Sequence, residues 1–155
     1  RLRVLSIERF GLGAHLAAIE RLKVSLAAEG LFAEERKRRL PRLPRRIGLV
    51  TGNDAAAKRD VLTTIAARFP PVRVLVAETY VQGARAAVEI EAALRELCER
   101  GADVVVLARG GGSFEDLLPF SDERLVRAVA ACPVPVVSAV ANRRRVSPVA
   151  SSAAG

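Results

Sequence analysis

The sequence predicts an α/β fold with an open, doubly wound parallel sheet, and two observations lead to this prediction. Four short runs between residues 46 and 140 are almost continuously apolar and rich in valine and leucine, as expected for strands covered on both faces. These runs alternate with segments of 10 to 17 residues whose apolar positions have helical spacing. Strands that alternate with helices in this way are typical of βαβ units and therefore of a Rossmann-like sheet.

The alternating region begins and ends with a strand. The predicted strands are RIGLVTG, VRVLVAET, DVVVLAR and VPVVSAV, at residues 46–52, 72–79, 103–109 and 134–140. The predicted helices between them occupy residues 54–68, 84–100 and 121–132. Asp54 and Ser121 stand at the start of the first and last of these helices, and both residue types are favoured N-caps.

Two helices and a single strand are predicted before this region. Residues 12–29 have the amphipathic spacing of a helix closed by Gly30, and a short charged helix follows at about residues 33–39. Residues 2–8 (LRVLSIE) have the pattern of a strand, but no neighbouring strand is close in sequence. We therefore expect the chain to begin inside a larger domain.

The net charge of +8 is unevenly distributed. Residues 1–47 carry a net charge of +7, residues 48–142 carry −2, and residues 143–155 carry +3. Much of the surplus lies in residues 36–46 (RKRRLPRLPRR), where two prolines favour an exposed, extended connector. Such a connector could contact a phosphate backbone or could be a solvated linker, and charge alone does not separate these interpretations.

Length and composition exclude several classes of protein. A chain of 155 residues with 50% hydrophobic residues suffices for one sizeable core. No apolar run approaches the roughly 20 residues of a membrane span, and the N-terminus lacks the pattern of a signal peptide. Cys98 and Cys132 lie in predicted helices without the spacing of a zinc site, so we expect buried thiols in a reducing cytoplasm and no metal ligands.

The most informative motif follows the third predicted strand. In ARGGGSFED (residues 108–116), Arg109 ends the strand and Gly110, Gly111 and Gly112 follow. Ligands of open parallel sheets bind at the carboxyl ends of the strands. Three glycines let backbone N–H groups converge on an anion, and an arginine adds a bidentate donor. The motif therefore favours a phosphate site, with a tight structural turn as the alternative.

Other features of this edge are less specific. The glycines match neither GxxxxGK[ST] nor GxGxxG followed by an acid, so they support neither a P-loop NTPase nor a dinucleotide-binding fingerprint. Ser113 is expected to cap the next helix, with Glu115 and Asp116 in its first turn. Gln82 and Gly83 lie at another strand-to-helix turn, where they either position a phosphate or form a plain turn.

Several segments resemble, in order and spacing, the large subunit of the exodeoxyribonuclease VII family. They are RIGLVTGNDAAAKRD, ETYVQG, ARGGGSFEDLLPFSDERLVRAV and PVPVVSAV. GLGAHLAAIERLKVSLAAEGLF and RLPRLPRRIG are similar to that family's connector, and the resemblance covers about residues 1–141. It implies the last strand of a truncated OB-fold at 1–8, a helical and basic connector at 9–46, the α/β catalytic domain at 47–142 and a divergent tail at 143–155.

The resemblance implies an exodeoxyribonuclease that hydrolyses single-stranded DNA from either end to oligonucleotides with 5′-phosphates. It also implies a hetero-oligomer with a small helical subunit, a cytoplasmic location, no strict metal requirement and Mg²⁺ as an optional cofactor. Asp60 and Arg109 match catalytic positions, Asp60 for proton transfer and Arg109 for stabilising charge on the phosphate oxygens. Without the resemblance, Asp60 would be taken for an ordinary acid on a helix surface. The expected phosphate-binding residues are Gly110, Gly111, Gly112, Ser113, Gln82 and Gly83.

The resemblance stops after Val140. There the family continues as Gly-His-Glu-Thr-Asp with a catalytic histidine and aspartate, whereas this chain has Asn142 and Arg145 at those two positions. An amide does not exchange protons near neutral pH, and an arginine reverses the charge of a carboxylate. We therefore expect impaired hydrolysis, and the abrupt change favours a shift of reading frame over gradual decay. A non-catalytic phosphate- or nucleotide-binding module is the alternative function.

Overall fold

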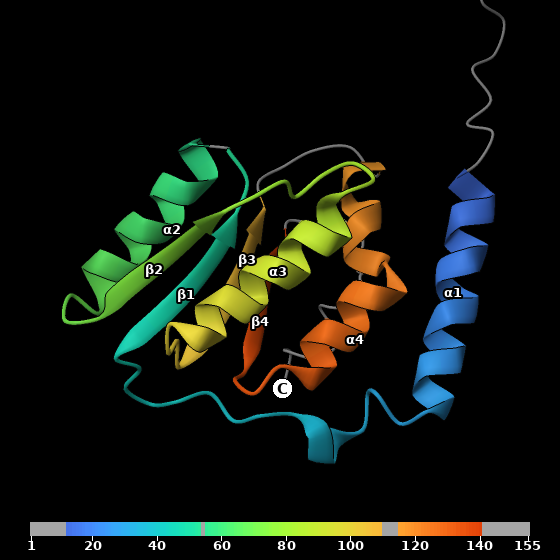
Figure 1. Cartoon of the computed structure of the whole chain (residues 1–155), viewed down its shortest axis with the longest axis horizontal. Helices are drawn as coiled ribbons and strands as arrows, with labels where there is room; N and C mark the ends of the chain where they lie inside the picture. Colours follow the sequence, from blue (N-terminus) through green and yellow to red (C-terminus); the bar gives the residue numbers. More distant parts are fainter. Residues whose placement is uncertain (1–11, 54, 110–114, 141–155) are drawn as a thin grey trace, which may run out of the picture.

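The centre of the molecule is a four-stranded sheet whose strands are all parallel (Figure 1). A computed structural model of the chain describes residues 12–53, 55–109 and 115–140. The strand order is β2-β1-β3-β4, with β1 at Arg46–Thr51, β2 at Arg73–Glu78, β3 at Val104–Arg109 and β4 at Val136–Val140. The predicted open α/β fold is confirmed, and each strand starts and ends within two residues of its predicted position.

Four α-helices and two 3₁₀ helices accompany the sheet within the described residues. They are α1 (Leu12–Ala28), α2 (Ala55–Arg68), α3 (Ala86–Glu99), α4 (Glu123–Ala131), η1 (Glu34–Arg36) and η2 (Glu115–Ser121). The connection from β1 to β2 through α2 runs toward one side of the sheet, and the connections through α3 and α4 run toward the other side. Because such crossovers are right-handed, α2 covers one face of the sheet and α3 and α4 cover the opposite face. Figure 1 shows α3 and α4 in front of the strands.

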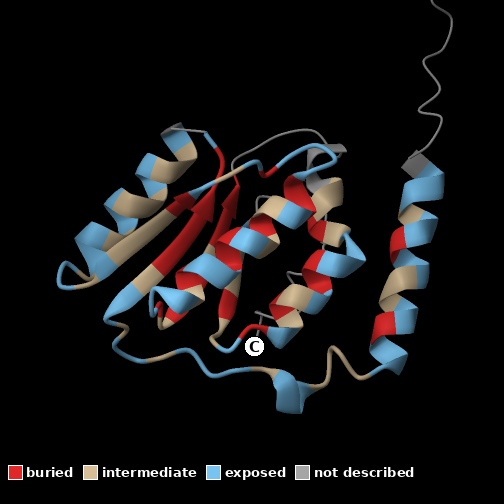
Figure 2. Cartoon of the chain, viewed as in Figure 1, coloured by how far each residue is buried: buried red, intermediate tan, exposed pale blue. Residues whose placement is uncertain are grey.

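The main core lies between the sheet and the pair of helices α3 and α4, as the buried segments in Figure 2 show. Ile90 and Leu97 of α3 and Leu125 of α4 are fully buried there. Gly48 of β1 allows α3 to approach closely, because a Cβ at that position would lie 3.0 Å from Leu97 Cδ1. In contrast, α2 has no fully buried residue among its described side chains, so its face of the sheet is covered more lightly.

Two predicted helix boundaries are wrong. The last helix is capped by Asp122 and not by Ser121, because the backbone of Asp122 is extended and its Oδ1 accepts a hydrogen bond of 2.9 Å from the backbone N–H of Arg124. Ser121 is instead the last residue of η2. The short helix expected at 33–39 is reduced to the single turn of η1, since the chain is already extended at Lys37. The expected cap Asp54 and strand 2–8 lie outside the described residues.

The first helix is attached to α4 by an ion pair. Arg127 donates from Nη1 and Nη2 to the two carboxylate oxygens of Glu29, at 2.7 and 2.9 Å. These hydrogen bonds lower the pKa of Glu29 and raise the pKa of Arg127. Leu26 of α1 is fully buried, and Gly30, with φ of 74°, then turns the chain into the connector. The connector runs past the amino ends of the strands to reach β1 (Figure 1).

Candidate functional site at the carboxyl edge of the sheet

Arg109 is the last residue of β3, as predicted, and it exposes only 7% of its surface. Side chains alternate along a strand, so Arg109 leaves the sheet on the same face as Val105 and Leu107. Those two residues pack in the core cluster with Ile90 and Leu97 of α3. The Arg109 side chain is therefore held at the edge of the α3 face, and charge–charge interactions are stronger at such a shielded place than at an open surface.

Asp60 lies in the second turn of α2 and is exposed. Its backbone carbonyl accepts a hydrogen bond of 2.7 Å from Thr64 Oγ1. Lys58, on the same helix, forms an ion pair with Glu78 at the end of β2, which fastens α2 to that strand. Because α2 and α3 cover opposite faces of the sheet, the structure does not bring Asp60 to the side on which Arg109 lies.

Thr51, the last residue of β1, is a polar residue at this edge that sequence analysis missed. It is completely buried, and its Oγ1 has no hydrogen-bond partner within the described residues. Its backbone carbonyl accepts a bond of 3.0 Å from the N–H of Thr79, just after β2. A buried hydroxyl without a partner is costly and needs an explanation, such as a ligand or an ordered water. The sequence signal that could have identified Thr51 is a polar residue at the end of an apolar strand.

Two loops meet at the carboxyl edge, where Gly52 follows β1 and Val81 follows β2. A Cβ on Gly52 would lie 2.7 Å from Val81 Cγ2, so only glycine allows this close approach. Gln82 and Gly83 follow, both exposed, and Gly83 has a φ of 84°. Their predicted place at a strand-to-helix turn is confirmed, and a contact with phosphate stays a prediction.

The turn after β2 is fixed to α3 by one carboxylate. Glu89 accepts a bond of 2.6 Å from Arg85 Nη2 and a longer one of 3.4 Å from Thr79 Oγ1. Both donors lie in the segment that joins β2 to α3. The loop that carries Gln82 is therefore held at both ends.

The remaining predicted site residues lie outside the described residues. They are Gly110, Gly111, Gly112, Ser113, Asn142 and Arg145. The first described element after the glycines is the 3₁₀ helix η2, which contains Pro119. This helix begins at Glu115, so Glu115 and Asp116 lie in its first turn as expected, and the cap expected at Ser113 stays a prediction.

The two cysteines are free thiols that contact each other. Cys132 is buried and Cys98 is partly buried, and their Sγ atoms are 3.4 Å apart. Burial raises the pKa of the Cys98 thiol to about 12, and the contact with Cys132 adds to this shift. Within the described residues no group of three or more histidine, cysteine or acidic side chains is arranged to hold a metal ion.

The basic connector lies at the other edge of the sheet. Asp103, just before β3, accepts hydrogen bonds at Oδ2 from the backbone N–H groups of Arg45 (2.6 Å) and Arg46 (2.8 Å). Arg38 donates from Nε to the carbonyl of Cys132, 2.7 Å away and shortly before β4. These contacts place the connector at the amino ends of the strands, whereas Arg109 lies at their carboxyl ends. Within the described part of the chain, no helix is long and apolar enough to cross a membrane.

Comparison with known proteins shows extensive similarity to one family. Residues 31–141 match the family described as exonuclease VII, large subunit. The exodeoxyribonuclease 7 large subunits of Thermobifida fusca and Acidothermus cellulolyticus are each 57% identical to this chain over 143 residues, which is 92% of it. The corresponding protein of Streptomyces coelicolor is 56% identical over 142 residues. The chain spans 34 to 35% of the length of these curated relatives.

Proposed function

Since the chain belongs to the exonuclease VII large-subunit family, we propose that it supplies the α/β domain of an exodeoxyribonuclease. Its substrate would be single-stranded DNA, hydrolysed from either end to oligonucleotides with 5′-phosphates. The names of the relatives, exodeoxyribonuclease 7 large subunit, support this reaction class. The structural observation that carries the proposal is Arg109 at the carboxyl end of β3, where open parallel sheets bind their ligands.

Arg109 is the residue to which we assign the main chemical role. Hydrolysis of a phosphodiester places additional negative charge on the non-bridging oxygens, and a guanidinium group can donate two parallel hydrogen bonds to them. Its low exposure supports this role, because a donor that is already shielded and held by the core loses little solvation and little freedom when the phosphate arrives. Thr51 Oγ1 is a further polar group at the same edge, but it lies on the α2 face, because its register partner is Ala108 and not Arg109.

The other assignments follow from the family. Gly110, Gly111, Gly112 and Ser113 would surround the phosphate with backbone N–H groups, and Gln82 and Gly83 would contact a neighbouring nucleotide. Asp60 would take part in proton transfer, and its exposed position on the α2 face requires that the DNA pass over the edge of the sheet to reach it. We propose no metal-dependent step, and Mg²⁺ would be an optional cofactor.

The proposed partners follow from the family. A small subunit would assemble with the large subunit, and the complex would act in the cytoplasm on single-stranded DNA. For this chain we propose impaired cleavage, because Asn142 and Arg145 occupy positions at which the family has a catalytic histidine and aspartate. The same two residues favour the second candidate function, a phosphate- or nucleotide-binding module without catalysis.

Binding experiments separate the two functions. Fluorescence anisotropy would measure the affinity for oligothymidylate at increasing NaCl concentrations, with thymidine 5′-monophosphate as competitor. The nucleic-acid function predicts an affinity that falls steeply with salt, with a slope of about −0.7 per phosphate contacted, and weak competition by the mononucleotide. Saturation by the mononucleotide at low concentration, with little effect of salt, would favour the binding module.

A further inference from the structure

The seven basic residues of the connector divide into two groups with different roles. Three of them already have partners within the described residues, and two of these three hold the connector in place. Lys37 Nζ is paired with Glu34 Oε1 at 2.8 Å, Arg38 Nε binds the carbonyl of Cys132, and Arg46 Nη1 donates to the carbonyl of Arg100 at 2.8 Å. The backbone is fixed as well, because the carboxylate of Asp103 accepts two of its N–H groups. The connector is therefore fixed to the α/β domain and is not a flexible linker.

The other four basic residues recur at every third position and are Arg36, Arg39, Arg42 and Arg45. All four are exposed, and their side chains form no hydrogen bond or ion pair with any described residue. Two exposed leucines lie between them: Leu40 exposes 57% of its surface and Leu43 exposes 74%. The outer surface of the connector therefore combines unneutralised positive charge with apolar side chains.

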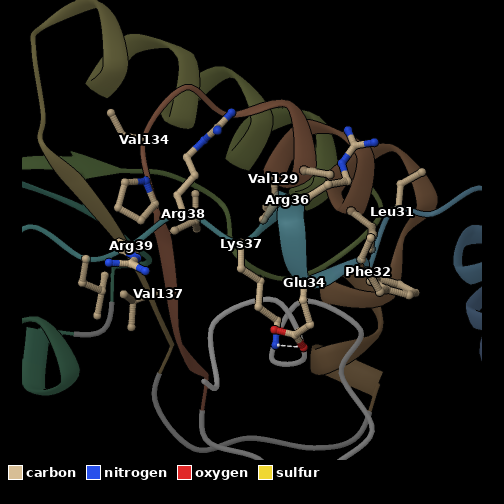
Figure 3. Close-up of a pocket in the computed structure, with 16 residues that line it drawn as sticks. Leu31, Phe32, Glu34, Arg36, Lys37, Arg38, Arg39, Val129, Val134 and Val137 are labelled. Carbon is tan, nitrogen blue, oxygen red and sulfur yellow. Dashed lines mark hydrogen bonds and ion pairs between the residues drawn. The ribbon is translucent and has the colours of Figure 1, made fainter.

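A groove of about 350 Å³ opens beside this surface (Figure 3). It lies between the connector on one side and α4 and β4 on the other. Its apolar lining includes Leu31, Phe32, Val129, Val134 and Val137. Four consecutive basic residues, 36–39, also line it, and its one acidic residue, Glu34, is already paired with Lys37. Figure 3 shows this ion pair and, apart from it and from each other, the side chains of Arg36 and Arg39.

The chemistry of the groove selects one kind of partner. A row of free guanidinium groups fits a chain of phosphates, and an apolar groove beside them fits flat, unstacked bases. A duplex offers phosphates but keeps its bases stacked inside, so it would use only the charged half of the surface. We propose that the groove and the row Arg36, Arg39, Arg42 and Arg45 form a second binding surface for single-stranded DNA, at the sheet edge opposite to Arg109. The identity of this polyanion rests on the proposed function.

The distance between the two edges gives the surface a role in substrate choice. Strand β3 has six residues, so its two ends are about 20 Å apart. A dinucleotide would reach one edge only, whereas a longer strand would reach both. The connector surface would therefore favour long single strands over short products without taking part in bond cleavage.

The experiment compares two double variants of the whole chain. Arg36→Gln with Arg39→Gln removes two charges from the groove. The control, Arg21→Gln with Arg68→Gln, removes two exposed charges outside the proposed surface, one on α1 and one at the end of α2. The probe is labelled oligothymidylate about 20 nucleotides long, longer than a typical single-strand site. We expect the slope of log affinity against log salt to become shallower by about 1.4 in the groove variant and to stay unchanged in the control.

A second pair of variants tests the apolar half. Leu40→Ser should weaken binding of oligothymidylate without changing the salt slope, whereas Val24→Ser, at an exposed apolar site on α1, should have no effect. Equal salt slopes for the two arginine double variants would contradict the proposal that the arginine row binds phosphates. Equal affinities for the two serine variants would contradict the proposal that the groove binds bases.

The outcome is independent of the test of function. Weaker dinucleotide binding in an Arg109→Lys chain, together with an unchanged salt slope in the groove variant, would support the proposed function and contradict this surface. A shallower slope in the groove variant, together with dinucleotide binding that Arg109→Lys leaves unchanged, would support this surface and contradict the proposed role of Arg109.

Discussion

The Sγ atoms of Cys98 and Cys132 lie 3.4 Å apart and link α3 to the end of α4. Cys132 also presents its backbone carbonyl to Arg38 of the connector, so three segments meet at this pair. Burial and the neighbouring thiol both favour the uncharged form of Cys98, which raises its pKa to about 12.

We therefore expect Cys98 to alkylate slowly at neutral pH. The thiolate is the reactive species, and an ordinary cysteine is half ionised near about pH 8.5. The rate of modification by iodoacetamide, measured by mass spectrometry in a Cys132→Ser chain and in the unaltered chain, should keep rising above about pH 10, well past that ordinary value. A rate that levels off near the pH at which a cysteine peptide levels off would contradict the raised pKa.

Gly48→Ala should destabilise the fold. The new Cβ would lie 3.0 Å from Leu97 Cδ1 and 3.1 Å from Val105 Cγ2, and both neighbours are fully buried. Overpacking of this kind costs about 1–3 kcal/mol, which urea denaturation would measure. Gly13→Ala is the matched control, because Gly13 lies in α1 with nothing within 4 Å of the new Cβ. The control should leave stability unchanged or raise it, and equal losses in both variants would show that the close packing is not the cause.

Asp103 should make part of the stability depend on acid pH. Its hydrogen bonds from the backbone N–H groups of Arg46 and Arg45 lower its pKa below the ordinary value. A carboxylate with a lowered pKa contributes stability above the pKa of the unfolded chain, about 3.9, and this contribution disappears as the pH falls further. Asp103→Asn should reduce stability at neutral pH and make it less dependent on pH between about 5 and 3. Parallel pH profiles for the two chains, measured by thermal melting, would contradict the assignment.

Restoring the family's residues should restore some cleavage. Asn142→His with Arg145→Asp returns a group that exchanges protons near neutral pH and a carboxylate to the positions where the family has them. Release of acid-soluble label from single-stranded DNA would measure the gain over the unaltered chain, which should show little activity. The matched control, Arg143→His with Arg144→Asp, introduces the same two residue types at neighbouring positions and should gain nothing. Equal activity in both double variants would contradict the proposed defect.

The fold was predictable because its signals are local. Runs such as VVVL in β3 are apolar over their whole length, and only strands covered on both faces need that pattern. The role of the connector was not predictable, because it depends on contacts with residues far away in sequence. Nothing in RKRRLPRLPRR indicates that Arg38 will reach the carbonyl of Cys132, 94 residues later, while its neighbour Arg39 forms no such bond within the described residues.

The position of Arg109 in the candidate site was predictable as well. The end of β3 at Arg109 follows from the change from apolar residues to glycines. The separation of Asp60 from Arg109 by the sheet follows instead from the crossover of α2, which single-residue patterns do not reveal. Thr51 was missed because a threonine at a strand end is common, and only its complete burial makes it notable.

The most direct test of the account concerns the guanidinium group of Arg109. Arg109→Lys keeps the charge and removes the bidentate donor, so any loss of affinity reports the proposed geometry and not the charge. The ligand is a 5′-phosphorylated thymidine dinucleotide. The chain also carries Arg36→Gln and Arg39→Gln, which weaken the proposed connector surface, so that the measured affinity reports binding at the carboxyl edge. Arg73→Lys in the same background is the control, because Arg73 is exposed at the opposite edge.

Isothermal titration would give the dissociation constants. Losing a hydrogen bond to a charged group costs about 1.5–3 kcal/mol, so the account predicts binding that is about 10-fold to 100-fold weaker in the Arg109 variant and unchanged in the control. A folded Arg109→Lys chain that binds the dinucleotide as tightly as the control would contradict the central claim that Arg109 holds a DNA phosphate at the carboxyl edge of the sheet.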